Sequence, residues 1–224
     1  MSGYRPFGDD PLSRFGAFVY TLLTVEGLLL LTTAPGVVAL VALSRDVANL
    51  PLSMACVLPV GPAVSAALVA LDQPREPADL HPAATFRHAY RANLRAVLIV
   101  WVPLLAVLTV LGTSLTHLSA ARIPGWWAAA LVGIALLSVL WGLNALVLVS
   151  FFSFRSRDVA RLAAYFLIRA PGVTVASTCV LVVAVGVVVM SSEAMLVLLG
   201  SMMTVLLLGA QRPLIRETGR EFIR

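Results

Sequence analysis

The chain has 224 residues, of which 60% are apolar and only 12% are charged, with a net charge of +5 and a mean hydropathy of +0.96. An ordinary soluble domain is about 45–50% apolar and about 25% charged, so this composition excludes a water-soluble globular protein. All sixteen basic residues are arginines. The composition predicts an all-α, polytopic membrane protein.

Six apolar runs are long enough to cross the hydrocarbon core of a bilayer, which takes about 20 helical residues. In chain order they are Ala17–Leu43, Leu50–Leu71, Leu94–Leu115, Trp126–Ser150, Val173–Met190 and Ala194–Ala210. Their spacing predicts a single membrane domain over residues 1–224. It would be built from two-helix units at 17–71, 94–150 and 173–210, followed by a cytoplasmic tail at 211–224.

The first run carries an ionisable residue well inside it. Glu26 lies nine positions after Ala17, which is roughly 13 Å along a helix at about 1.5 Å per residue. A carboxylate at that depth costs several kcal/mol unless it is protonated or partnered. Two interpretations are open: a proton or cation site, or a protonated glutamic acid that donates an interhelical hydrogen bond. Its candidate partners are Asn144 in the fourth run, Thr21 and Thr24 in its own run, and Arg14.

The second run contains a Pro-Gly-Pro element formed by Pro59, Gly61 and Pro62. Each proline removes a backbone donor and the glycine allows another helix to approach closely, so a kink or a short unwound segment is predicted within the membrane. Broken helices line binding sites in several transporter folds. Only Ser53 and Ser65 supply polar groups nearby, so a plain kink is favoured over a substrate site.

Arginines recur at helical spacing before the third run and before the fifth. The segments Phe86–Leu94 and Val159–Phe166 are therefore predicted to be cytoplasmic, amphipathic interfacial helices with a basic stripe beside an apolar row. Anchoring in anionic lipid headgroups is the favoured interpretation, and docking of an acidic cytoplasmic partner is the alternative. The stripes consist of Arg87, Arg91 and Arg95, and of Arg157, Arg161 and Arg169.

The arginines also predict the orientation of the chain. With six crossings, fourteen of them fall in segments on one side, and only Arg45 and Arg122 fall on the other. By the positive-inside rule, both termini are cytoplasmic. If Val173–Ala210 were one bent element, the tail and its four arginines would face outward, so six spans are preferred.

Two motifs resemble the YesL-like bacterial integral membrane proteins, a domain family of unknown function. They are Leu58–Leu68, with its Pro-Gly-Pro element and small residues, and Phe86–Arg95, a phenylalanine–arginine–asparagine helix that leads into the third span. The chain departs from the family pattern in that no threonine precedes Gly61, and Val37–Met54 lengthens the first hairpin. The resemblance implies the bacterial cytoplasmic (inner) membrane and an accessory role in carbohydrate ABC uptake or its regulation.

No residue constellation dictates a reaction, because the sequence contains no nucleophile elbow, no HExxH motif and no glycine-rich phosphate loop. His81 and His88 are separated by Pro82, which argues against a metal site. We therefore expect no enzyme, no cofactor and no nucleic-acid partner. The predicted function is a non-enzymatic accessory or scaffold protein of the membrane. The alternative is a small transporter or a transporter permease subunit.

Overall fold

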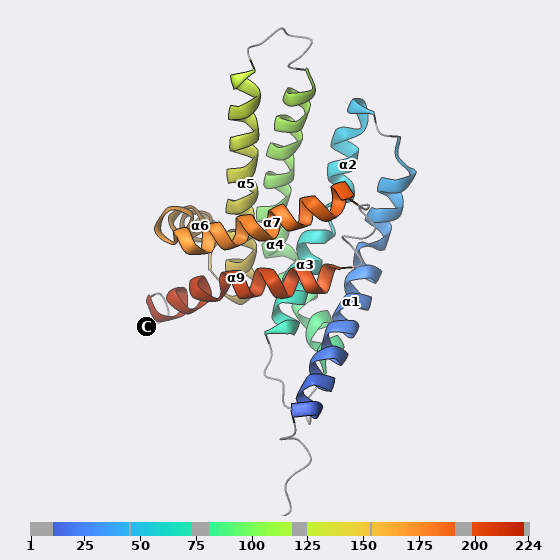
Figure 1. Cartoon of the computed structure of the whole chain (residues 1–224), viewed down its shortest axis with the longest axis vertical. Coiled ribbons are helices and arrows are strands. Elements are labelled where there is room, and N and C mark those ends of the chain that lie inside the picture. Colours follow the sequence, from blue (N-terminus) through green and yellow to red (C-terminus); the bar gives the residue numbers. More distant parts are fainter. Residues whose placement is uncertain are drawn as a thin grey trace, which may run out of the picture.

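A computed structural model describes residues 11–44, 46–72, 81–117, 125–152, 154–190 and 199–221, and almost all of these residues are helical (Figure 1). A 3₁₀ turn at Val47–Asn49 precedes the second helix. The helices are α1 (Pro11–Ala42), α2 (Leu50–Cys56), α3 (Val60–Leu71), α4 (Pro82–His117), α5 (Trp126–Phe151), α6 (Ser156–Arg169), α7 (Pro171–Met190) and α9 (Gly200–Glu221).

Four helical stretches in the described part of the chain are long and apolar enough to cross a membrane. The bent pair α6–α7, which turns by 96°, raises the number to five if it is one span. This confirms the prediction of an all-helical chain with several membrane-compatible helices. The four stretches are Phe15–Ala42, Val47–Leu71, Pro82–His117 and Trp126–Phe151.

Helix α3 lies at the centre and contacts α1, α4, α5 and α9. Its buried face consists mainly of small residues, which let neighbouring helix backbones approach closely, as is typical of helix packing in membranes. The bulkiest fully buried side chains are Phe86 of α4 and Phe166 of α6. These two rings therefore anchor the arginine-bearing segments of α4 and α6 to the core.

The structure departs from the expected arrangement in the third span. Phe86–Leu94, predicted to be a separate interfacial helix, forms the first turns of the continuous helix α4. At about 1.5 Å per residue the 36 residues of α4 extend about 54 Å, which exceeds a hydrocarbon core of about 30 Å. The sequence between Pro82 and Pro103 contains no glycine or proline to end the helix, so the two predicted elements are fused.

The C-terminal helices also differ from a simple up-and-down series. Helices α7 and α9 pack on each other and run across α4 and α5 instead of along them (Figure 1). The predicted sixth span begins at Ala194, outside the described residues. Helix α9 continues to Glu221, so the predicted tail from residue 211 forms its second half. Arg45 and Arg122, which were expected on the opposite side of the membrane, also lie outside the described residues.

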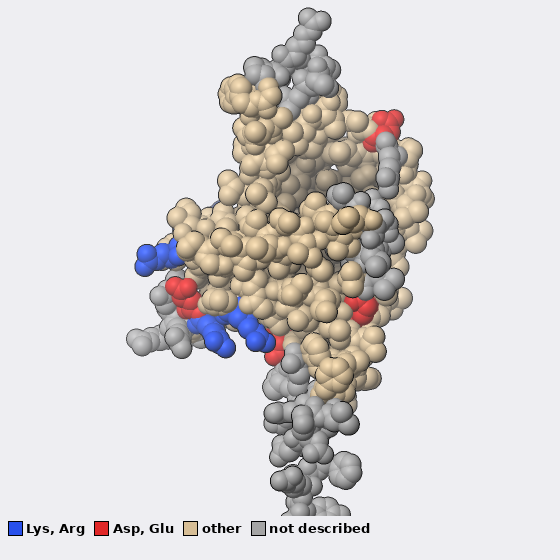
Figure 2. All heavy atoms as spheres, in the orientation of Figure 1, with Lys and Arg blue, Asp and Glu red and all other residues tan. Residues whose placement is uncertain are grey.

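The surface is divided between a charged region and an apolar one. In Figure 2 the arginine side chains in view gather around the ends of α6 and α9, whereas the projecting α4–α5 hairpin shows no charge. After Arg95, α4 carries no charged residue, and α5 carries none at all. Many apolar side chains of this hairpin face outward, among them Val110, which is 63% exposed. Such a surface is expected where lipid, not water, surrounds the protein.

Candidate functional site: buried polar contacts and an arginine-lined groove

The Pro-Gly-Pro element lies directly after an interruption between α2 and α3. Helix α2 ends at Cys56, and residues 57–59 form a turn before α3 begins at Val60. The Val57 carbonyl accepts a hydrogen bond of 3.1 Å from the Val60 N–H within this turn, and a second one of 3.3 Å from the indole Nε1 of Trp101 on α4. A Cβ on Gly61 would lie 2.7 Å from Trp101 Cγ. Gly61 thus provides room for the ring that packs against the interruption.

Helix α1 seals the other side of this interruption. A Cβ added at Gly36 would meet the carbonyl oxygen of Cys56 and lie 3.1 Å from Pro59 Cγ. Pro62 is buried in the first turn of α3, where its missing N–H needs no intrahelical partner. The interruption is therefore packed between α1 and α4, and its geometry is that of a repaired kink.

A first polar cluster joins α3, α4 and α5. Ser150 Oγ donates to Ser65 Oγ at 2.8 Å and also lies 2.6 Å from the Leu146 carbonyl oxygen. Asn93 Nδ2 contacts both Ser65 Oγ and the Ser150 carbonyl oxygen at 3.3 Å. The sequence showed Ser65 as one of two polar residues near the Pro-Gly-Pro element, but it did not identify Ser150 or Asn93 as its partners.

A second cluster contains Asn144, which the sequence had suggested as a partner of Glu26. In the structure Gln211 Nε2 of α9 donates to Asn144 Oδ1 at 2.8 Å and to Ser177 Oγ at 3.0 Å. Asn144 Nδ2 reaches the Ala163 carbonyl oxygen at 3.5 Å. Asn144 thus links α5 to α6 and α9, Gln211 extends the cluster to α7, and Asn144 does not pair with Glu26. Gln211 was missed because it was assigned to the tail.

Glu26 has a backbone partner instead. Its Oε2 accepts a hydrogen bond of 2.7 Å from the N–H of Ser201, in the first turn of α9. Its Oε1 is buried, has no hydrogen-bond partner among the described residues, and lies 3.7 Å from where a Cβ on Gly200 would be. A carboxylate is favoured at the positive end of a helix dipole. Glu26 therefore caps α9 from a different helix.

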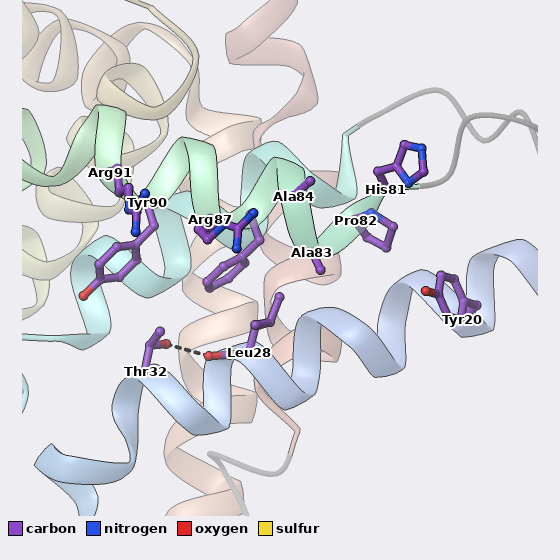
Figure 3. Close-up of a pocket in the computed structure, with 11 residues that line it drawn as sticks. Tyr20, Leu28, Thr32, His81, Pro82, Ala83, Ala84, Arg87, Tyr90 and Arg91 are labelled. Carbon is purple, nitrogen blue, oxygen red and sulfur yellow. Dashed lines mark hydrogen bonds between the residues drawn. The ribbon is translucent and has the colours of Figure 1, made fainter.

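The basic stripe of α4 faces away from the core. Arg87, Arg91 and Arg95 are exposed, whereas Phe86 and Ala89 on the other face of the helix are 2% and 5% exposed. Between α1 and the first turns of α4 lies a groove of about 450 Å³ (Figure 3). Tyr20, Leu28 and Thr32 of α1 line one wall. The other wall is formed by His81 and, from α4, by Pro82, Ala83, Ala84, Phe86, Arg87, Tyr90 and Arg91.

The basic stripe of α6 has no such groove beside it among the described cavities. Arg157, Arg161 and Arg169 are exposed, whereas Val159, Ala163 and Phe166 are fully buried against the bundle. Trp141 Nε1 of α5 donates to the Ala160 carbonyl at 3.1 Å and fixes α6 on α5. The α6 arginines therefore lie on the outer face of that helix, opposite its buried face.

Asp72, just after α3, is the described ionisable group with a perturbed proton affinity. Partial burial raises the pKa of its carboxyl above the ordinary 3.8, and the positive charge of Arg212 on α9 opposes that rise. The pair brings an acidic residue from the end of α3 close to the second half of α9.

Within the described ranges, no three His, Cys, Asp or Glu side chains come together as metal ligands. His81 lines the α1–α4 groove, His88 is exposed, and Cys56 and Cys179 are free thiols. The candidate site is thus the arginine-lined groove, together with the polar contacts that hold the surrounding helices.

The helices and contacts define an all-α protein compatible with multiple passes through a membrane. No family model, no curated protein and no solved structure matches the chain. The YesL-like resemblance and the carbohydrate role that it implies stay predictions.

Proposed function

We propose that the protein is a non-enzymatic accessory or scaffold protein of the bacterial inner membrane, which serves carbohydrate ABC uptake or its regulation. The observation that supports this most strongly is the use of the buried polar groups. Gln211 bonds to both Asn144 and Ser177, and Ser65 bonds to Ser150. These groups link helices, whereas a transporter directs such groups toward a substrate.

The proposed orientation places both termini in the cytoplasm. Helices α1 and α4 run in the same direction, since Tyr20 lies near Pro82 and Thr32 lies near Tyr90 (Figure 3). The starts of both helices therefore share one side of the membrane. Four crossings, or six if α7 and α9 form a final hairpin, return the chain to the side on which it began. The exposed arginines of α4, α6 and α9 favour the cytoplasm for that side.

Single-cysteine labelling tests this topology in intact cells. In a background of Cys56→Ser and Cys179→Ser, an impermeant thiol reagent is expected to label Thr116→Cys, at the exposed end of α4. It should reach the exposed positions of Arg157→Cys and Arg216→Cys only after the cells are permeabilised. Labelling of Arg157→Cys from outside would reverse the proposed orientation.

Copurification tests the scaffold function. The protein, purified from its native membrane in mild detergent, is expected to retain a component of a carbohydrate ABC transporter, identified by mass spectrometry. Arg157→Gln combined with Arg161→Gln would release that component if the α6 stripe docks it. Retention of the component would assign these arginines to lipid anchoring. Sugar uptake by proteoliposomes that contain the purified protein alone would instead support the transporter alternative and contradict a scaffold.

A further inference from the structure

The groove between α1 and α4 combines cationic, aromatic and apolar walls. Arg87 and Arg91 lie one helical turn apart, next to Tyr90, and Leu28 faces them from α1 (Figure 3). The volume of about 450 Å³ is within the range of small-molecule sites, about 300–1,000 Å³. A ligand that fits this groove therefore needs both a negative charge and an apolar part.

The two guanidinium groups are available to such a ligand. Arg87 and Arg91 are exposed and form no ion pair with any described residue. The sequence of α1 contains one acidic residue, Glu26. Its Oε2 accepts a hydrogen bond from the Ser201 N–H of α9. Arginine forks bind phosphate oxygens through paired, charge-assisted hydrogen bonds. The cationic wall therefore favours a phosphate.

A second hollow lies next to this groove, on the surface of α4 alone and toward the apolar half of that helix. It has about 440 Å³ and is lined by Arg91, Leu94, Arg95, Leu98 and Ile99. Arg91 lines both grooves, so they meet on one helix. Beyond Ile99 the helix continues without charge into the exposed apolar hairpin. The combined track is thus cationic where α4 begins and apolar toward its middle.

We propose that this track binds an anionic phospholipid. The phosphate lies between Arg87 and Arg91, and an acyl chain follows Leu94, Leu98 and Ile99 along α4. This inference deepens the proposed function and rests on the membrane location, because it turns the general anchoring expected of every arginine stripe into one defined site. The outer face of α6 provides an internal comparison, since it carries arginines at helical spacing and lines neither of these two cavities.

Native mass spectrometry of the full chain in detergent tests the proposal with phosphatidylglycerol and phosphatidylcholine as probes. Phosphatidylglycerol is expected to bind in a one-to-one ratio, and at least tenfold more tightly than the zwitterionic lipid. Arg87→Gln combined with Arg91→Gln should weaken phosphatidylglycerol binding roughly tenfold to thirtyfold, since each cation near an anionic lipid contributes a factor of about five. The matched control, Arg157→Gln combined with Arg161→Gln, removes the same charge and should change this binding less than twofold.

Two further results bear on the source of the anion and on folding. Inorganic phosphate at millimolar concentration is expected not to displace the lipid, and displacement would show an anion site without a lipid track. Equal binding of the two lipids, or equal losses in the two double variants, would overturn the proposal. If the Arg87/Arg91 variant fails to fold, the comparison of lipids on the unaltered protein still decides. A failed copurification with intact lipid binding would reject the scaffold function alone.

Discussion

The carboxylate of Glu26 is expected to hold the start of α9 against α1. Glu26→Ala removes the 2.7 Å hydrogen bond to the Ser201 N–H and leaves that donor without a partner. A hydrogen bond to a charged group contributes about 1.5–3 kcal/mol, and a helix cap about 0.5–2 kcal/mol. These ranges describe the same contact and overlap near 2 kcal/mol. We therefore expect the opening of the first turn of α9 to become easier by about 2 kcal/mol, or roughly thirtyfold.

Alkylation of a cysteine at position 201 measures this opening directly. Ser201 is 3% exposed, and Ser201→Cys keeps the backbone N–H that Glu26 accepts from. In a background of Cys56→Ser and Cys179→Ser, modification should follow transient opening of α9. Glu26→Ala should accelerate it roughly thirtyfold. Glu26→Gln keeps an acceptor oxygen but loses the charge, so it should accelerate modification by roughly fivefold or less.

Thr32→Ala is the matched control on α1. Its hydroxyl bonds only to the Leu28 and Leu29 carbonyls of its own helix, so its loss should not change the alkylation rate. Equal rates for Glu26→Ala and the unaltered carboxylate would refute the capping role. A large effect of Glu26→Gln, equal to that of alanine, would show that the negative charge and not the acceptor atom holds α9.

Three other perturbations are expected to have measurable effects. Gly61→Ala places a Cβ against an indole ring and should lower thermal stability in detergent by about 1–3 kcal/mol, whereas Gly133→Ala, with open space around it, should be neutral or stabilising. A double-mutant cycle of Asn144→Ala and Gln211→Ala should give a coupling energy of about 0.6–1.7 kcal/mol in detergent unfolding, and no coupling would exclude their hydrogen bond. Burial raises the pKa of the Asp72 carboxyl, so the unfolded chain loses this proton at a lower pH than the folded protein does. The free energy of unfolding should therefore fall as pH rises from about 4 through the pKa of the folded state. Asp72→Asn should flatten this dependence, and an unchanged pH profile in that variant would contradict the prediction.

Sequence patterns predicted the helical class and identified Glu26 and Asn144 as unusual polar residues, but they did not identify the partners of these two residues. The depth of Glu26 in an apolar run predicts that its carboxylate needs a partner. The partner is a backbone N–H, which every residue except proline possesses, so no side-chain pattern could have identified Ser201. The role of Asn144 was similarly hidden, because Gln211 looked like part of a polar tail and is instead a buried residue of α9.

Helix direction was equally beyond the sequence. Apolar runs at 173–190 and 194–210 predict helices, but periodicity does not say whether a helix lies along its neighbours or across them. That choice depends on packing between α7, α9 and the α4–α5 pair. The interruption before Gly61 could be predicted from the sequence, because a proline disrupts the helix at its own position in the chain. The ring that packs against the interruption, Trp101, comes from another helix and could not be predicted in this way.

The contact between Glu26 and Ser201 also has a consequence for biosynthesis. The two residues are 175 positions apart, so at about 5–20 residues per second a ribosome needs roughly 9–35 s to add the second after the first. During that interval α1 lacks the amide that its carboxylate accepts from in the finished protein. The α4–α5 hairpin, by contrast, joins neighbours in the chain and can form as soon as it is made. The first helix to be synthesised is therefore among the last to be completed, and a chain stopped before Ser201 would leave the Glu26 carboxyl without this partner.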